Sequence, residues 1–74
     1  MIEITIGRCL IPNLLKRKGM TQADLAVITG ISPTQINGYI SGERQSMTLR
    51  TAKKIACTLN CSIDDLYEWQ IRKL

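Results

Sequence analysis

Two helix-start signals lie so close together in the middle of the chain that only one short helix and a tight turn fit between them. Thr21 and Asp24 form a capping box, the pattern that begins a helix, and Ser32 and Gln35 repeat it. Gly30, just before the second box, tolerates the positive φ that ends a helix and redirects the chain. The sequence therefore predicts two short helices joined at a sharp angle.

Apolar residues in the segment 22–41 recur at helical spacing and assign a buried face to each helix. The positions predicted to face inward are Leu25, Ala26, Ile28, Ile31, Ile36, Tyr39 and Ile40. In the second helix, about residues 33–40, the residues predicted to face outward are Pro33, Thr34, Asn37 and Gly38, with Gln35 beside them. An exposed polar face at this place is typical of a helix-turn-helix, which inserts its second helix into the DNA major groove.

Further signals predict helices on both sides of this pair. Pro12 and Gly19 bound a first helix, Thr48 and Asn60 bound a fourth, and Ser62 caps a short fifth. The predicted inner face of the fourth helix consists of Leu49, Ala52, Ile55, Ala56 and Leu59. The chain thus predicts about five short helices.

The two ends of the chain alternate apolar and polar residues, which is the pattern of strands. The apolar positions are Ile2, Ile4 and Ile6 at the start and Tyr67, Trp69 and Ile71 at the end. An isolated two-stranded ribbon is marginal in water, so its apolar face must pack on its own helices, on a second copy, or on both. We expect the termini to pair antiparallel, with Tyr67, Trp69 and Ile71 at or beside a two-fold interface.

The composition bears on the class of function. The 74 residues carry ten basic and six acidic side chains, a net charge of +4, which suits a polyanionic partner without identifying it. With no histidine, no Cys-x-x-Cys pair and no glycine-rich phosphate loop, we expect no catalytic residue, no metal site and no cofactor. Of the three cysteines, Cys57 and Cys61 are interpreted as small apolar fillers. The odd number of cysteines without a framework spacing favours reduced thiols, so we expect a cytoplasmic protein. We expect no association with membranes, because no apolar stretch is long enough to span one.

Taken together, these segments resemble the Cro/repressor-type (xenobiotic-response-element) family of helix-turn-helix regulators. The matching residues are Thr21-Gln22-Ala23-Asp24-Leu25-Ala26, Gly30-Ile31-Ser32, Ile36, Ser41-Gly42 and the run from Leu49 to Leu66. The resemblance covers about residues 12–67. It implies an all-α, five-helix lambda-repressor-like domain over residues 1–74, with a helix-turn-helix core at about 22–41 and a small antiparallel ribbon from the termini. It also implies a homodimer on a double-stranded DNA operator, with no small-molecule ligand.

The resemblance further implies roles for individual residues. The expected contacts to DNA bases are Pro33, Thr34, Gln35, Asn37 and Gly38. The expected contacts to DNA phosphates are Gln22, Ser32, Ser41, Arg44, Gln45 and Ser46. Asparagine and glutamine can pair with two atoms of adenine, and the threonine methyl group can pack on thymine.

Four residues depart from the family pattern. Thr29 replaces an apolar residue, which a hydrogen bond from a buried hydroxyl to the helix would explain. Gly38 interrupts the second helix, either to let DNA approach closely or because an exposed site tolerates it. Ile40 stands where an acidic residue is common, and Glu43 weakens the positive potential near the expected phosphate contacts.

Three functions remain open from the sequence. The leading interpretation is a dimeric transcriptional regulator acting on its own operator, because one helix contacts too few base pairs for useful specificity. The alternatives are the DNA-binding antitoxin of a toxin–antitoxin pair and a protein-interaction module that has lost DNA binding. The net charge and the polar outer face of the second helix argue against the last of these.

Overall fold

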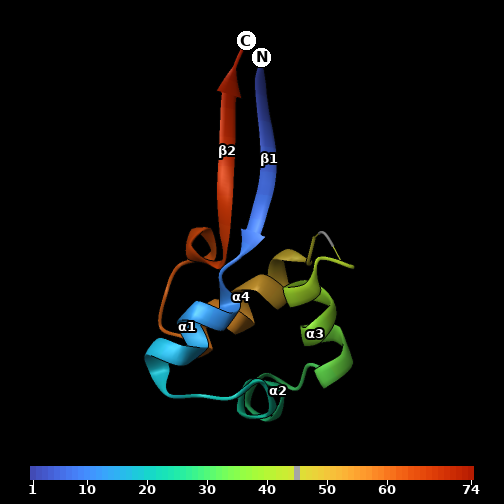
Figure 1. Ribbon diagram of the computed structural model, residues 1–74, viewed down its shortest axis with the longest axis vertical. Helices are drawn as coiled ribbons and strands as arrows, with labels where there is room; N and C mark the ends of the chain where they lie inside the picture. Colours follow the sequence, from blue (N-terminus) through green and yellow to red (C-terminus); the bar gives the residue numbers. More distant parts are fainter. Residues whose placement is uncertain (45) are drawn as a thin grey trace.

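A two-stranded ribbon projects from a small helical body in the computed structural model, which describes residues 1–44 and 46–74 (Figure 1). The elements are β1 (Ile2–Cys9), α1 (Ile11–Lys18), α2 (Gln22–Thr29), α3 (Pro33–Ser41), α4 (Leu49–Thr58), the 3₁₀ turn η1 (Ile63–Leu66) and β2 (Tyr67–Lys73). The molecule measures 41 × 22 × 19 Å, and the ribbon accounts for the long dimension.

The expected ribbon is confirmed, whereas the expected number of helices is wrong. The strands β1 and β2 pair antiparallel, with Ile4 opposite Ile71 and Ile6 opposite Trp69. The described residues form four α-helices, and the fifth predicted helix is the four-residue turn η1. Its predicted capping signal is present, because the Ser62 N–H donates to Asp65 Oδ2 at 3.0 Å. The segment is too short to become α-helical because the extended strand β2 follows at once.

The core lies between the four helices and the base of the ribbon. It consists of Ile11, Leu14, Leu15, Leu25, Ala26, Ile31, Ile36, Ala52, Ile55, Ala56, Leu59, Leu66 and Tyr67. Two residues predicted to face inward are instead exposed, Ile28 at 62% and Leu49 at 76%. The short helix α2 buries only one side, formed by Leu25, Ala26 and Thr29, and Leu49 is the first residue of α4.

The turn between α2 and α3 forms as the capping signals predict. Thr21 Oγ1 accepts a hydrogen bond from the Asp24 N–H at 3.1 Å, and Asp24 Oδ2 accepts one from the Thr21 N–H at 3.0 Å. Gly30 ends α2 with φ of 74°, a left-handed conformation that residues with a Cβ adopt only at a cost. Ser32 Oγ then accepts a bond from the Gln35 N–H at 3.1 Å and begins α3. The sharp angle between the two helices is therefore set locally.

Thr29 holds this turn from the inside. Its buried hydroxyl donates to the Leu25 carbonyl oxygen at 2.7 Å, which confirms the bond to the helix that the sequence suggested. The same oxygen accepts a bond from the Ile31 N–H at 3.2 Å, on the far side of Gly30. One hydroxyl group thus ties the last turn of α2 to the first residue beyond the turn.

We predict that Thr29→Val lowers the free energy of unfolding by about 1–3 kcal/mol, because valine has nearly the same shape but leaves the buried Ile31 N–H without an acceptor. Urea denaturation measures this. Thr58→Val is the matched control. The Thr58 hydroxyl makes the same kind of bond, to the Lys54 carbonyl at 2.9 Å, and it accepts no bond from a backbone N–H of the described residues. Equal effects of the two substitutions would contradict a special role for Thr29.

Candidate nucleic-acid interface

Helix α3 lies on the side of the body away from α1 (Figure 1). Ile36 and Tyr39 anchor the helix from within, with exposed fractions of 0% and 4%. Pro33, Thr34 and Asn37 are exposed, as the spacing of the apolar residues predicts. The structure therefore brings three of the expected base-contacting residues onto one accessible surface.

Gln35 has a hydrogen bond that the sequence did not predict. Its side-chain Nε2 donates to the Tyr39 hydroxyl at 2.8 Å, one helical turn further along α3. The side chain consequently does not complete the second capping box, although the Gln35 backbone N–H does bond to Ser32. The bond to Tyr39 uses one amide hydrogen and leaves Oε1 and the second hydrogen available, the two groups that pair with adenine. Tyr39 thus restrains the amide group of Gln35.

The predicted exposure of Gly38 is wrong. The residue is buried because the side chain of Arg44 lies across it. A Cβ atom at position 38 would be 3.1 Å from Arg44 Cδ and 3.2 Å from Arg44 Cγ. The space that the glycine opens on α3 is therefore filled by a side chain of the same protein.

The expected phosphate-contacting residues lie at both ends of α3 and at the start of α2. Gln22 is exposed in the first turn of α2, and Ser32 is the exposed cap of α3. Ser41, the last residue of α3, and Ser46 beyond it are exposed, whereas Gln45 lies outside the described residues. The Ser41 hydroxyl already donates to the Gly38 carbonyl at 3.3 Å.

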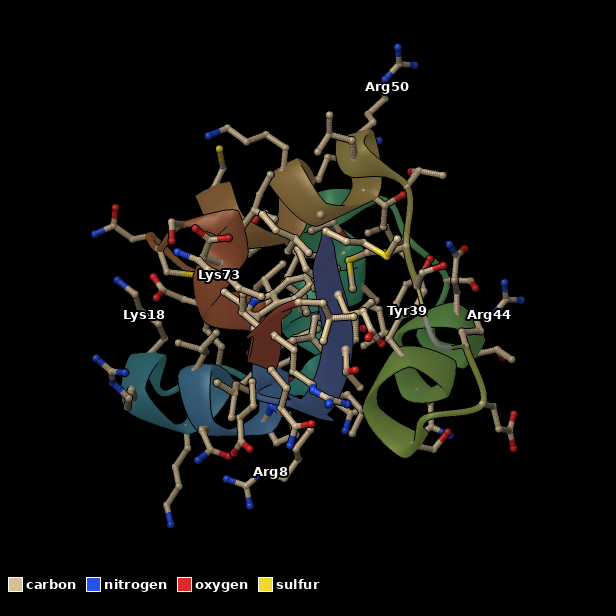
Figure 2. All side chains as sticks on the ribbon, turned by 90° about the horizontal axis from the view of Figure 1, so that it is seen from above. Arg8, Lys18, Tyr39, Arg44, Arg50 and Lys73 are labelled. Carbon is tan, nitrogen blue, oxygen red and sulfur yellow. The ribbon has the colours of Figure 1, made fainter. Side chains whose placement is uncertain are left out.

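The positive charges do not gather on one side of the molecule. Figure 2 shows Lys18 and Arg44 pointing away from the body on opposite sides, with Arg44 beside α3. Lys16, Arg17 and Lys18 form the last turn of α1, where cations complement the helix dipole. Arg8 forms an exposed ion pair of 3.2 Å with Glu68 on the ribbon. Of the cations labelled in Figure 2, Arg44 is thus the one that stands beside α3.

The cysteine thiols divide into two kinds. Cys9 and Cys61 pack partly buried against the core, and burial raises the pKa of both thiols. The interpretation of Cys57 as an apolar filler is wrong, because this residue is exposed on α4.

Across residues 1–44 and 46–74, no three side chains of the metal-binding types lie together. No helix in that part of the chain is long and apolar enough to cross a membrane.

The contact between Gly38 and Arg44 is the feature of this surface that sequence reasoning missed. Its signal was present as a glycine within a helix, followed shortly after the helix by an arginine. Helical periodicity gives the direction in which position 38 points, but it cannot show that the loop returns over it. Only the folded chain reveals that the two residues form one unit.

A capped pair of short helices with a polar, exposed second helix defines a helix-turn-helix DNA-binding domain. Residues 11–71 match the family model described as the Cro/C1-type HTH DNA-binding domain, and the chain belongs to this family. The resemblance found in the sequence is thereby confirmed.

Two relatives come from Bacillus subtilis (strain 168). The chain is 42% identical over 73 residues to the SPbeta prophage-derived uncharacterized HTH-type transcriptional regulator YopS, covering 99% of each chain. It is 33% identical over 61 residues to the SPbeta prophage-derived uncharacterized HTH-type transcriptional regulator YotL, covering 82% of this chain and 76% of the relative. Both comparisons extend well beyond the helix-turn-helix core.

Proposed function

We propose that this chain, a DNA-binding transcriptional regulator, acts as a homodimer that places α3 of each copy in the major groove of one operator half-site. The observation that carries the proposal is the exposed face of α3 with Thr34, Gln35 and Asn37. The membership in a DNA-binding family and the likeness to proteins named as transcriptional regulators support it. No feature of the described residues distinguishes a DNA-binding antitoxin from a regulator, so the antitoxin alternative stays a prediction.

The base contacts are assigned by chemistry and exposure. The amide groups of Asn37 and Gln35 can each pair with two atoms of an adenine, and the Thr34 methyl group can pack on a thymine. Tyr39 supports this assignment for Gln35, because an amide group already restrained by a hydrogen bond loses less entropy on binding. Pro33 lies beside these residues at the first turn of α3.

The phosphate contacts are assigned to the helix ends. Gln22 and Ser32 stand where unpaired N–H groups and the helix dipole favour an anion. Ser41 and Ser46 lie at or beyond the opposite end of α3 and suit the second DNA backbone. The expected phosphate contact of Gln45, which is outside the described residues, stays a prediction. Such contacts position the protein on the duplex and carry no sequence information.

The ribbon supplies the surface proposed for dimerisation. Residues directly opposite one another in a two-stranded sheet share a face, so Ile4, Ile6, Trp69 and Ile71 lie together on one side. Ile4 and Ile71 are 60% and 63% exposed. The apolar surface continues onto the body as a hollow of ≈ 280 Å³, lined mainly by Ile6, Met47, Leu49, Ala52, Ile63, Leu66, Tyr67 and Trp69. A continuous apolar face of this kind needs a cover, and a second copy carries a matching one.

Face-to-face packing suits this ribbon better than pairing through its edges. A four-stranded sheet formed edge to edge would double the apolar face and leave it in water. Packing the two apolar faces together removes both from water, and the opposite face, with Glu3, Thr5, Gln70 and Arg72, stays solvated. At the base of the ribbon the Tyr67 ring packs edge to face against the Trp69 ring, with 6.3 Å between the ring centroids, and so supports the apolar face.

We predict that Asn37→Ala and Gln35→Ala each weaken binding to the selected operator by about 1–3 kcal/mol and relax the base preference at one position per half-site. Selection from random duplex DNA followed by titration measures both effects. Asn13→Ala is the matched control, because Asn13 is exposed on α1, away from α3. Wild-type preferences in both α3 variants would refute the assignment.

For the dimer, we predict that Ile71→Glu yields a folded monomer that binds a single half-site normally and a two-half-site operator poorly. Its charge would stand in the middle of the proposed interface. Trp69 is less suitable for this test, because its Nε1 donates to the Asp64 carbonyl at 3.0 Å within the same chain. Gln70→Glu adds the same charge to the other face of β2 and should leave the dimer intact. Sedimentation at several protein concentrations measures the oligomeric state of wild type and both variants. A wild-type chain that is monomeric well above its DNA-binding concentration would refute the proposed dimer.

A further inference from the structure

The centre of the exposed face of α3 is occupied by a residue from outside the helix. With 3.6 residues per turn, Thr34, Gly38 and Ser41 lie on one line along α3, opposite the side that Ile36 and Tyr39 bury. Gly38 is the middle residue of this line, and it is nevertheless buried. What covers it is the side chain of Arg44.

The backbone and the side chain of Arg44 both fit this position. Gly42 adopts φ of 88° after α3 ends, which turns the chain back, and the Arg44 N–H then donates to the Gly38 carbonyl oxygen at 3.1 Å. The stem follows the helix surface, so that Arg44 Nε lies 3.3 Å from where a Cβ of residue 38 would be. The side chain remains exposed and points away from the body on the side of α3 (Figure 2).

We propose that Arg44 contacts a guanine base in the major groove, as a substitute for the side chain that α3 lacks at position 38. This inference rests on the proposed insertion of α3 into DNA. A guanidinium group presents a planar pair of donors that matches the O6 and N7 acceptors of guanine. The central line of an inserted helix faces the floor of the groove, whereas phosphates flank it on both sides. Because the Arg44 stem crosses that central line, its guanidinium group is presented to base edges.

Gly38 is then a positioning residue for Arg44. A methyl group at position 38 would require the Arg44 side chain to move by a few tenths of an ångström. A long side chain would occupy the place of the arginine stem and displace it. The identity of residue 38 therefore decides which side chain, its own or that of Arg44, stands at the centre of the DNA-facing surface.

The experiment selects duplexes from a random pool with wild type, Arg44→Ala and Arg44→Lys. We expect wild type to require a guanine at one position of each half-site. Arg44→Ala should lose that preference by about 10- to 100-fold, whereas Arg44→Lys should lose less of it, because an ammonium group still donates to O6 or N7 but lacks the planar pair of donors. Both variants should keep the preferences at the other positions. Arg44→Lys keeps the charge, so it should retain the wild-type slope of log affinity against log salt. Replacing the selected guanine by 7-deazaguanine, which lacks the N7 acceptor, should weaken wild type and leave Arg44→Ala unaffected.

Two further variants test the role of Gly38. Gly38→Gln should exchange the guanine preference for another base at the same position, while Gly38→Ala should reduce it only slightly. Alanine and glutamine both favour helix over glycine, so circular dichroism and thermal unfolding should show that both variants fold.

An equal loss of affinity for all duplexes would overturn the inference. If Arg44→Ala weakens binding to all duplexes by the same factor, with base preferences unchanged and a shallower salt slope, Arg44 contacts a phosphate, as its place in the sequence first suggested. A wild-type chain that selects no sequence at all would instead overturn the proposed function, and this inference with it. Selection of a motif whose guanine preference survives in Arg44→Ala overturns the inference alone.

Discussion

The angle between α2 and α3 is the constraint on which the rest of the structure depends. Four residues set it, with Gly30 in the left-handed conformation and the Thr29 hydroxyl bonded to both Leu25 and Ile31. A buried threonine where the family has an apolar residue looks unfavourable in the sequence, but it satisfies an N–H group that the turn would otherwise leave unpaired inside the core. Because α3 has one buried side, fixing this angle also fixes which residues face outward.

The sequence predicts well what short-range interactions decide. The caps at Thr21, Ser32 and Ser62 bond to groups three residues away, and the structure contains capping bonds at all three. At Ser32 the bond from the Gln35 backbone N–H is present, whereas the Gln35 side chain does not bond back. The pairing of the termini was also predictable, because apolar residues that alternate at both ends give each segment one apolar face, and antiparallel pairing brings the two faces together.

What the sequence could not supply depends on contacts between segments. Periodicity alone placed Ile28 and Leu49 inside, but too little protein covers the outer side of α2 and the start of α4. The fifth helix is a 3₁₀ turn because β2 must begin at Tyr67 to meet β1. Gly38 does point outward along α3, as predicted, yet a loop outside the helix covers it. Local patterns thus gave the elements and most of the exposed face, and missed what tertiary contacts place on that face.

The surface proposed for dimerisation and the residues proposed to contact DNA lie on adjoining parts of the chain. Ile6 of β1 lines the same hollow as Tyr39 and Arg44, so a change at the base of the ribbon can reach residues beside the proposed DNA contacts. The proposed contacts on α3 are coupled to their neighbours as well, because Gln35 is bonded to Tyr39 and Arg44 lies on Gly38. A substitution at Gly38 or Tyr39 therefore acts on a neighbouring residue that is proposed to contact DNA. On the proposed contacts, the base preference due to Gln35 and Arg44 depends on packed pairs of residues, whereas Thr34 and Asn37 act from single positions along α3.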